Sequence, residues 1–345
     1  MVDMLTIKSF FLAGLVSFIL TPFVRRLCLK MDWMDVPKDA RRVHKKPIPR
    51  IGGIAIYLAF LLGILVYCPL NRESIGLLVG ASVIVLSGFI DDTKGLTPRG
   101  KLLFQALAAL CLVWGGSSIE FFTNPTPGHE LVYLGYLGIP LTIFWVAGIT
   151  NSINLIDGLD GLASGVTMIS AISLLFIAQR YQQTQVVIVA AVLAGACLGF
   201  LFFNFNPASI FMGDTGALLL GFVLSYISIE GVMKSVAAIA IFLPVIILGV
   251  PIFDTTFAML RRAISGRGIM SADKGHLHHR LLNKGLSQRE TVAVLYLISI
   301  LFGVLANIVS QLPAKDALTV CVIIVVLVFL LASLFGMFSN KGTQE

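Results

Sequence analysis

Apolar residues form long runs over most of this chain, and short polar segments separate the runs. An α-helix that crosses a bilayer needs roughly 20 predominantly apolar residues. Eleven runs approach that length, at about residues 4–24, 51–70, 74–90, 102–119, 131–149, 161–178, 185–203, 216–233, 235–257, 291–310 and 316–338. The pattern therefore predicts an all-α polytopic membrane protein with about eleven transmembrane helices.

Two of these runs admit a second interpretation. Residues 4–24 have the position of a secretory signal peptide, but only Lys8 precedes the apolar core and no small-residue cleavage site is evident. Because more spans follow, we interpret this run as the first span. The fifth run begins with HELVYLGYLGIP, which is rich in Gly and Tyr. That part also fits a short hairpin or surface segment before a shorter span.

The composition supports a membrane protein. Hydrophobic residues make up 57% of the chain and charged residues 12%, whereas soluble domains carry about 25% charged residues. The five cysteines are scattered without the spacing of a metal site or a disulfide framework: Cys28, Cys68, Cys111, Cys197 and Cys321. No internal repeat or soluble domain is evident, so we expect a single membrane domain over residues 1–345.

The basic residues predict the orientation of the protein in the membrane. Cytoplasmic loops carry an excess of Lys and Arg. Of the 25 such residues, twenty lie in the segments 25–50, 91–101 and 259–290 or at Lys341, and five lie on the opposite side. This bias places the N-terminus outside and the C-terminus in the cytoplasm. It also accounts for the net charge of +7 without a nucleic-acid partner.

Five polar loops are expected on one face. Successive spans alternate in direction, so loops separated by two spans lie on the same side. The loops 25–50, 91–101, 150–161, 204–215 and 258–290 are spaced in this way. We therefore expect all five at the cytoplasmic face, where they would form the active site.

Two of these loops carry carboxylates beside an apolar helix. In GFIDDTKG, Asp91 and Asp92 follow the third run, although adjacent carboxylates repel each other and are costly to desolvate. They indicate either a solvated pair at a helix end or a site for metal-phosphate or acid-base chemistry. In NFNPASIFMGDTG, Asp214 fits a helix N-cap or a metal ligand. Mg²⁺ prefers carboxylate oxygens and often retains substrate phosphates.

The loop NSINLIDGLDGLA carries four polar side chains at intervals of three residues: Asn151, Asn154, Asp157 and Asp160. At helical pitch this spacing groups them on one side of a turn, and the glycines between them let the backbone approach a ligand closely. A turn that only caps a helix needs one such residue. The pattern therefore favours a ligand-binding turn.

The last loop combines several arginines with His276, His278 and His279, and Asp254 lies near the end of the preceding span. The arginines alone fit the topology. A zinc site is open in principle because imidazole suits Zn²⁺, but no Cys lies near and the surrounding positive charge repels a cation. Basic and imidazole groups together suit a phosphate or pyrophosphate better.

The segment PKDARRVHKKPIPRIGG, which contains His44, is the remaining basic loop. It either anchors the protein to anionic lipid or captures a lipid phosphate or a nucleotide. The chain has no GxxxxGK[ST], no GxGxxG and no nucleophile elbow. Together the loops predict a pocket at the membrane boundary for a divalent cation and a diphosphate, reached partly from the bilayer.

Four motifs in order, GFIDDTKG, NSINLIDGLDGLA, NFNPASIFMGDTG and DKGHLHHRL, resemble those of the polyprenyl-phosphate N-acetylhexosamine-1-phosphate transferases, and the resemblance covers nearly the whole chain. It implies ten or eleven spans and a site at the cytoplasmic face of the bacterial inner membrane. It implies that a sugar-1-phosphate passes from a UDP-sugar to a polyprenyl phosphate, which releases UMP, and that the reaction needs Mg²⁺ or Mn²⁺.

The resemblance also implies roles for single residues. Asp214 would be the principal metal ligand and Asn154 the second, and Asp91 and Asp92 match paired aspartates implicated in catalysis and diphosphate binding. Lys101 matches a basic residue near the phosphates. Asp157, Asp160, Asn204 and Phe211 match positions that line the nucleotide-sugar pocket, and Asn151 and His44 are further substrate-binding candidates. His276, His278, His279 and Arg280 match the loop that contacts sugar or pyrophosphate, and the three histidines are candidate catalytic residues together with Asp91 and Asp92.

The branch of the family is indicated by the form HLHH with a following Arg, which resembles the enzymes that use UDP-GlcNAc to start teichoic acid, O-antigen or related glycans. The peptidoglycan branch, which uses UDP-MurNAc-pentapeptide, typically has three consecutive histidines, and Leu277 interrupts them here. A transporter of organic anions or nucleotide sugars is the alternative of another class. It is disfavoured because the polar groups gather on one side and no repeat is evident. The sequence leaves open whether the protein forms a homodimer.

Overall fold

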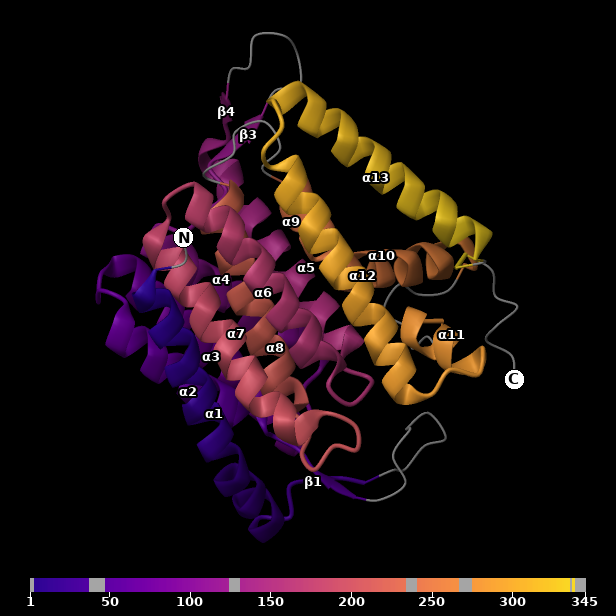
Figure 1. Ribbon diagram of the computed structural model, residues 1–345. Coiled ribbons are helices and arrows are strands. Elements are labelled where there is room, and N and C mark those ends of the chain that lie inside the picture. Colours follow the sequence, from indigo (N-terminus) through magenta and orange to yellow (C-terminus); the bar gives the residue numbers. More distant parts are fainter. Residues whose placement is uncertain are drawn as a thin grey trace.

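The computed structural model describes residues 3–36, 47–123, 131–233, 241–266, 275–335 and 337–338. Within these residues the chain is almost entirely helical (Figure 1). The helices are α1 (Met4–Lys30), α2 (Gly53–Tyr67), α3 (Arg72–Lys94), α4 (Pro98–Gly115), α5 (Gly138–Ile156), α6 (Leu162–Arg180), α7 (Thr184–Asn204), α8 (Gly213–Ser228), α9 (Phe242–Ile247), α10 (Gly249–Ile264), α11 (Leu277–Asn283), α12 (Gln288–Val309) and α13 (Ala314–Leu334).

Short elements complete the description. A 3₁₀ turn, Gly135–Leu137, precedes α5, and a π-helical turn, Ile229–Met233, continues α8. Two antiparallel hairpins are formed by β1 (Met34–Asp35) with β2 (Ile48–Pro49) and by β3 (Phe121–Thr123) with β4 (Leu131–Tyr133).

Eight of the described helices are long and apolar enough to cross a bilayer, by length and composition. They are α1, α3, α5 with its 3₁₀ turn, α6, α7, α8 with its π turn, α12 and α13, and α2 is a shorter apolar helix. The expectation of an all-α polytopic membrane protein is therefore confirmed. Each of the eleven apolar runs contains at least part of a described helix, but eight rather than eleven reach spanning length and composition.

Two runs depart from a simple transmembrane helix. The fifth run begins with strand β4, and α5 starts only at Gly138, so the hairpin interpretation is correct for this part. The ninth run is divided between α9 and α10 at Leu248, whose φ of −87° and ψ of 22° interrupt the helix. Pro251 contributes to the break because it has no N–H to donate to the carbonyl four residues earlier. Figure 1 shows α10 lying across the direction of α12.

Helix α8 occupies the centre of the bundle. Its spanning window is completely buried, and it packs against α2, α3, α5 and α6. Gly88 permits the close approach of α3, because a Cβ at this position would overlap the backbone of Thr215 in the first turn of α8. Small residues at a crossing let the backbones of membrane helices come together. The end of α3 therefore lies against the beginning of α8.

The outward faces of α1, α12 and α13 carry large apolar side chains. Leu15, Leu301 and Leu330 are all more than half exposed. Extended apolar surfaces of this kind mark contact with lipid or protein rather than with water. These three helices thus present an apolar exterior, as the hydrocarbon core of a membrane requires.

Candidate active site

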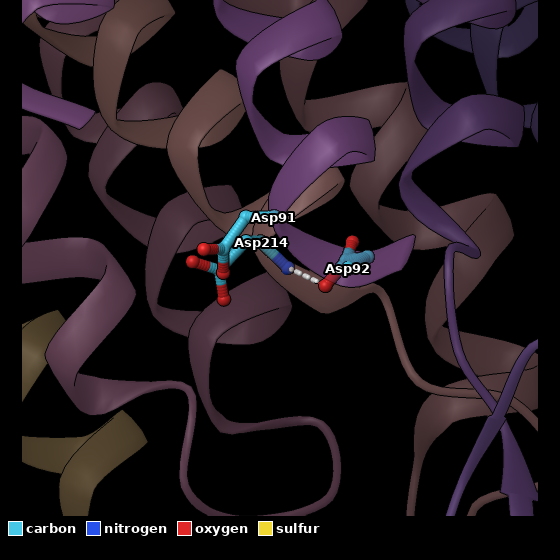
Figure 2. Close-up of side chains that lie close together, drawn as sticks. All are labelled: Asp91, Asp92 and Asp214. Carbon is cyan, nitrogen blue, oxygen red and sulfur yellow. Dashed lines mark hydrogen bonds between the residues drawn. The ribbon is translucent and has the colours of Figure 1, made fainter. Parts of the chain in front are cut away.

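Three carboxylates meet where α3 ends and α8 begins. Asp91, Asp92 and Asp214 each offer an oxygen, and these atoms lie within 4.8 Å of one another. Figure 2 shows the carboxylates of Asp91 and Asp214 beside each other and Asp92 set apart from them, joined to the backbone of Asp214 by a hydrogen bond. The fold thus brings together the two acidic motifs that the sequence singled out.

Asp92 holds the start of α8. Its Oδ1 accepts a hydrogen bond from the backbone N–H of Asp214 (3.0 Å), and its Oδ2 accepts from the N–H and the hydroxyl of Thr215 (2.9 and 2.6 Å). The Nε of Arg50 lies 2.8 Å from Oδ1, and the Asp92 side chain is completely buried. The carboxylate therefore satisfies N–H groups that lack partners within the helix and lies at the positive end of its dipole.

Asp91 and Asp214 share a cation. Lys101 Nζ lies 2.8 Å from Asp91 Oδ2 and 2.5 Å from Asp214 Oδ2. The other oxygen of Asp91 accepts from the N–H of Leu96 (2.8 Å), which fixes the turn between α3 and α4. Thr97 caps α4 through the N–H of Gly100, and this start places Lys101 at the beginning of the helix, facing both acids.

Arg50 reaches the same cluster from the segment after β2. Its Nη2 lies 3.3 Å from Asp214 Oδ1, in addition to its contact with Asp92. Backbone hydrogen bonds hold this segment in place, because the N–H of Phe211 donates to the carbonyl of Pro49 and the N–H of Gly52 donates to the carbonyl of Phe211 (both 2.8 Å). Phe211 therefore links the segment before α8 to the one that carries Arg50.

The cluster suits a divalent cation. Three carboxyl groups face two cationic side chains, so the basic residues do not balance all of the acidic ones. Mg²⁺ commonly uses one or two carboxylates and completes its shell with water and substrate phosphates. Asp91 and Asp214 fit that requirement once Lys101 moves away from one of them. Asp92 fits it less well because both of its oxygens bond the start of α8.

The loop after α5 lies beside this cluster. Burial, reinforced by the negative charge of Asp214, raises the pKa of the Asp157 carboxyl to about 7. Asn154 is half-buried in the last turn of α5. Asn151 forms two hydrogen bonds with Gln105 of α4 (3.1 and 2.9 Å), which lies one turn beyond Lys101. The contacts of Asn151 join α5 to α4, the helix that carries Lys101 of the acidic cluster.

Two further candidates hold loops to one another. Oδ2 of Asp160 accepts from Asn206 Nδ2 (2.9 Å) and from the N–H of Ala208 (3.0 Å). Oδ1 of Asn204 accepts from the N–H of Gly161 (3.1 Å), and its Nδ2 donates to the carbonyl of Ile210 (3.0 Å). The loops after α5 and α7 are thereby joined into one surface.

The histidine segment contacts the same loop. A Cβ on Gly158 would lie 2.7 Å from His278 Nε2, so the His278 ring lies directly against the loop after α5. His278 is 3% exposed, and burial, with the neighbouring His279, lowers its pKa to about 3. The rings of His278 and His279 are 4.3 Å apart. His276 is also buried and bonds Asp254.

Arg280 is attached to the backbone on both sides of its helix. Its Nε donates to the carbonyl of Gly275 (3.0 Å), and its Nη2 donates to the carbonyl of Met337 beyond α13 (3.4 Å). It thus connects the histidine segment to the end of the described chain. His44 lies outside the described residues.

Two residues of the site were missed by sequence reasoning, and a third was noticed without a role. Arg50 belongs to a loop whose arginines all fit the topology, and only its place directly before IGG distinguishes it. Gln105 is a polar residue inside an apolar run, and that position is a signal of a buried partner. Asp254 was noticed at the end of its run, but it received no role.

Fold and site together define a polytopic helical membrane protein with an acidic, cation-lined cluster formed by residues far apart in sequence. The family model for glycosyl transferase family 4 matches residues 74–232. The chain is 39% identical over 338 residues to a probable undecaprenyl-phosphate N-acetylglucosaminyl 1-phosphate transferase of Bacillus subtilis. The alignment covers 97% of this chain and 93% of that protein. The chain therefore belongs to this family of transferases, as the sequence motifs indicated.

Two other groups of relatives are more distant. A decaprenyl-phosphate N-acetylglucosaminephosphotransferase of Mycolicibacterium smegmatis is 34% identical and covers 91% of this chain and 84% of that protein. A phospho-N-acetylmuramoyl-pentapeptide-transferase of Halalkalibacterium halodurans is 32% identical and covers 87% of this chain and 94% of that protein. Similarity thus extends to both branches that the sequence motifs distinguished.

Proposed function

We propose that this protein transfers N-acetylglucosamine 1-phosphate from UDP-N-acetylglucosamine to undecaprenyl phosphate and releases UMP, as the first step of a cell-envelope glycan. One observation carries the proposal: the cluster of Asp91, Asp214, Lys101 and Arg50 lies in a chain that matches the Bacillus subtilis transferase over 97% of its length. The interrupted histidine motif supports N-acetylglucosamine over the muramoyl-pentapeptide substrate.

The proposed location is the plasma membrane of a bacterium, with the site at the cytoplasmic face. The distribution of Lys and Arg supports this orientation, with the N-terminus outside and the C-terminus inside. Eleven spans are consistent with it if α2, α4 and the broken segment of α9 and α10 also lie in the membrane. The protein would then bind UDP-sugars at the cytoplasmic face, where the five polar loops are expected.

The reaction is a phosphoryl transfer. An oxygen of the lipid phosphate attacks the β-phosphorus of the UDP-sugar, and the bond from that phosphorus to the bridging oxygen breaks, so that UMP leaves with the oxygen. A phosphate monoester has a second pKa of about 6, so the acceptor is largely a dianion at neutral pH and needs little help from a base. Asp91 would orient this phosphate or remove its last proton.

The other side chains divide the remaining tasks. Asp214 and Asn154 would hold Mg²⁺ or Mn²⁺, which neutralises charge that develops on the diphosphate. Lys101 and Arg50 would stabilise the same charge from the protein side. The histidine segment with Arg280 would contact sugar or pyrophosphate. The nucleotide-sugar pocket would be lined by Asn151, Asp157, Asp160, Asn204, Phe211 and His44, with Asp92 fixing the start of α8.

A product assay tests the proposal. Purified protein in detergent is offered undecaprenyl phosphate with UDP-GlcNAc, UDP-GalNAc or UDP-MurNAc-pentapeptide, with and without Mg²⁺, and UMP and the lipid product are measured. We expect UMP from UDP-GlcNAc only with the metal, loss of activity in Asp214→Asn, and normal activity in Asp316→Asn, a control at the exposed start of α13. Turnover of the pentapeptide substrate alone would favour the other branch, and no product at all would favour transport.

A further inference from the structure

We infer that Asp254 is a positioning residue that fixes the tautomer and the place of His276 and thereby the seating of the whole histidine segment. The inference rests on the proposed function for its kinetic consequence but not for its geometry. Asp254 lies on α10, and the histidines lie more than twenty residues further along the chain. The residues between them are partly outside the described ranges, so the inference rests on the direct contacts of Asp254 with His276 and Leu277.

Both oxygens of Asp254 bond the beginning of the histidine segment. Oδ2 lies 2.8 Å from His276 Nδ1, and Oδ1 accepts from the backbone N–H of Leu277 at 2.6 Å. Asp254 is 3% exposed and His276 is 6% exposed, so water does not compete for these bonds. A buried carboxylate with two directed partners holds them in a single arrangement.

The contact determines which nitrogen of His276 carries a hydrogen. An ionised carboxylate only accepts hydrogen bonds, so Nδ1 of His276 must donate to Asp254. Nε2 is then the nitrogen left for other partners, either as an acceptor in the neutral ring or as a donor in the charged ring. A carboxylate that orients an imidazole in this way controls how the other nitrogen acts on a substrate or ligand.

The arrangement is transmitted to the other histidines. The rings of His276 and His278 are stacked at 5.8 Å with an interplanar angle of 7°, and His278 lies against Gly158 in the loop after α5. Helix α11 has only seven residues, and a helix that short is not stable by itself. Asp254 fixes its first residue, so it also fixes how His278 and His279 meet the neighbouring loop.

A purely structural cap would explain only half of this geometry. Bonding the N–H of Leu277 requires one acceptor, which an asparagine also provides. The second oxygen faces an imidazole nitrogen, and there a carboxylate and an amide differ. In Asp254→Asn the amide oxygen can keep the Leu277 bond, but the NH₂ group donates toward Nδ1 and so moves the hydrogen of His276 to Nε2.

The experiment reads the tautomer directly. Protein labelled with ¹⁵N-histidine contains five histidines, and His276→Gln identifies the signals of His276 in a nanodisc spectrum. We expect protonated Nδ1 in the wild type and unprotonated Nδ1 in Asp254→Asn. Asp316→Asn, which makes the same substitution at an exposed position, should leave the spectrum unchanged. Unaltered His276 signals in Asp254→Asn would overturn the inference whether or not the protein is a transferase.

Kinetics test the consequence for catalysis. With UDP-GlcNAc and undecaprenyl phosphate, Asp254→Asn should lower kcat by about 10- to 100-fold, with a smaller change in KM and a melting temperature near that of the wild type. Because Asp254 acts through His276, the double variant with His276→Gln should be no slower than His276→Gln alone. Additive losses would contradict this role. If Asp254→Asn unfolds, a normally folded His276→Gln with full activity contradicts it as well.

Discussion

The two adjacent carboxylates at the end of α3 are expected to respond differently to the same substitution. Asp92 accepts hydrogen bonds from Asp214 and Thr215 and pairs with Arg50, and its side chain is completely buried. In Asp92→Asn the amide retains one oxygen, so one set of donors at the start of α8 loses its acceptor. Arg50 also loses the charge of its nearest partner.

The magnitude follows from these contacts. A buried donor left without an acceptor costs about 1–3 kcal/mol, and the Arg50 side chain is 29% exposed, so the loss of its partner's charge adds less than the roughly 3–5 kcal/mol of a fully buried ion pair. We therefore expect Asp92→Asn to lower the free energy of unfolding by about 3–5 kcal/mol. In Asp91→Asn the amide oxygen can keep the Leu96 bond and Lys101 keeps Asp214, so the loss should be about 1 kcal/mol.

Turnover should depend on Asp91 through its part in the reaction rather than through stability. Asp91→Asn should reduce kcat by about 100-fold or more if the carboxylate orients the attacking phosphate, although the protein remains folded. Stability is measured by SDS titration in mixed micelles, turnover by UMP release, and Asp316→Asn serves as the control. Equal losses of unfolding free energy in Asp91→Asn and Asp92→Asn would refute the division of roles. Full activity of Asp91→Asn at every pH would rule out a catalytic role for Asp91.

Three further outcomes are expected. The pKa of His278 in the folded protein lies far below its ordinary value of 6.5, so between pH 7.5 and 5 the unfolded chain takes up a proton that the folded chain does not. The free energy of unfolding, measured by SDS titration, should therefore fall by about 2 kcal/mol from pH 7.5 to 5. In His278→Gln this pH-dependent decrease should be absent. Lys101→Met should tighten Mn²⁺ binding about tenfold or more in an electron paramagnetic resonance titration while turnover falls, because an ammonium no longer competes for two carboxylates; unchanged affinity would contradict this. Gly88→Ala should lower the free energy of unfolding in an SDS titration by about 1–3 kcal/mol, because the added Cβ forces α3 away from α8. Gly148→Ala, whose Cβ would meet open space in α5, should be neutral or stabilising in the same titration.

The helices could be predicted because the bilayer imposes a simple rule on the sequence. A spanning helix must be apolar over its length, so each apolar run contains at least part of a helix. The rule fails where an apolar run does not need to span. Residues 131–133 are apolar enough to extend a run but pair as a strand, and the run at 235–257 is broken at Leu248. Hydropathy alone does not distinguish a broken helix from a continuous one.

The site could be predicted as a set of residue types but not as a set of contacts. Asp91 and Asp92 have the same chemistry and adjacent positions, and their difference arises because successive side chains on a helix point in different directions. Arg50 was missed because an arginine that pairs with a carboxylate looks the same in sequence as one that only fixes topology. Each distinction depends on which residue from another helix lies opposite, and one sequence contains no record of it.

The described polar residues fall into two groups according to where their hydrogen bonds go. Asp92, Asp160, Asn204 and Asp254 bond backbone or side-chain groups of other loops, as buried polar atoms beside a membrane must. Asp91 and Asp214 each use one oxygen in the same way, toward Leu96 and Arg50, but their Oδ2 atoms share the ammonium of Lys101, which is attached to a flexible chain and can move aside. A divalent cation can therefore replace this ammonium between the two carboxylates without breaking a bond that holds the loops together. The first group holds the loops around the acidic cluster in place, and the second group can then exchange one cation for another without moving those loops.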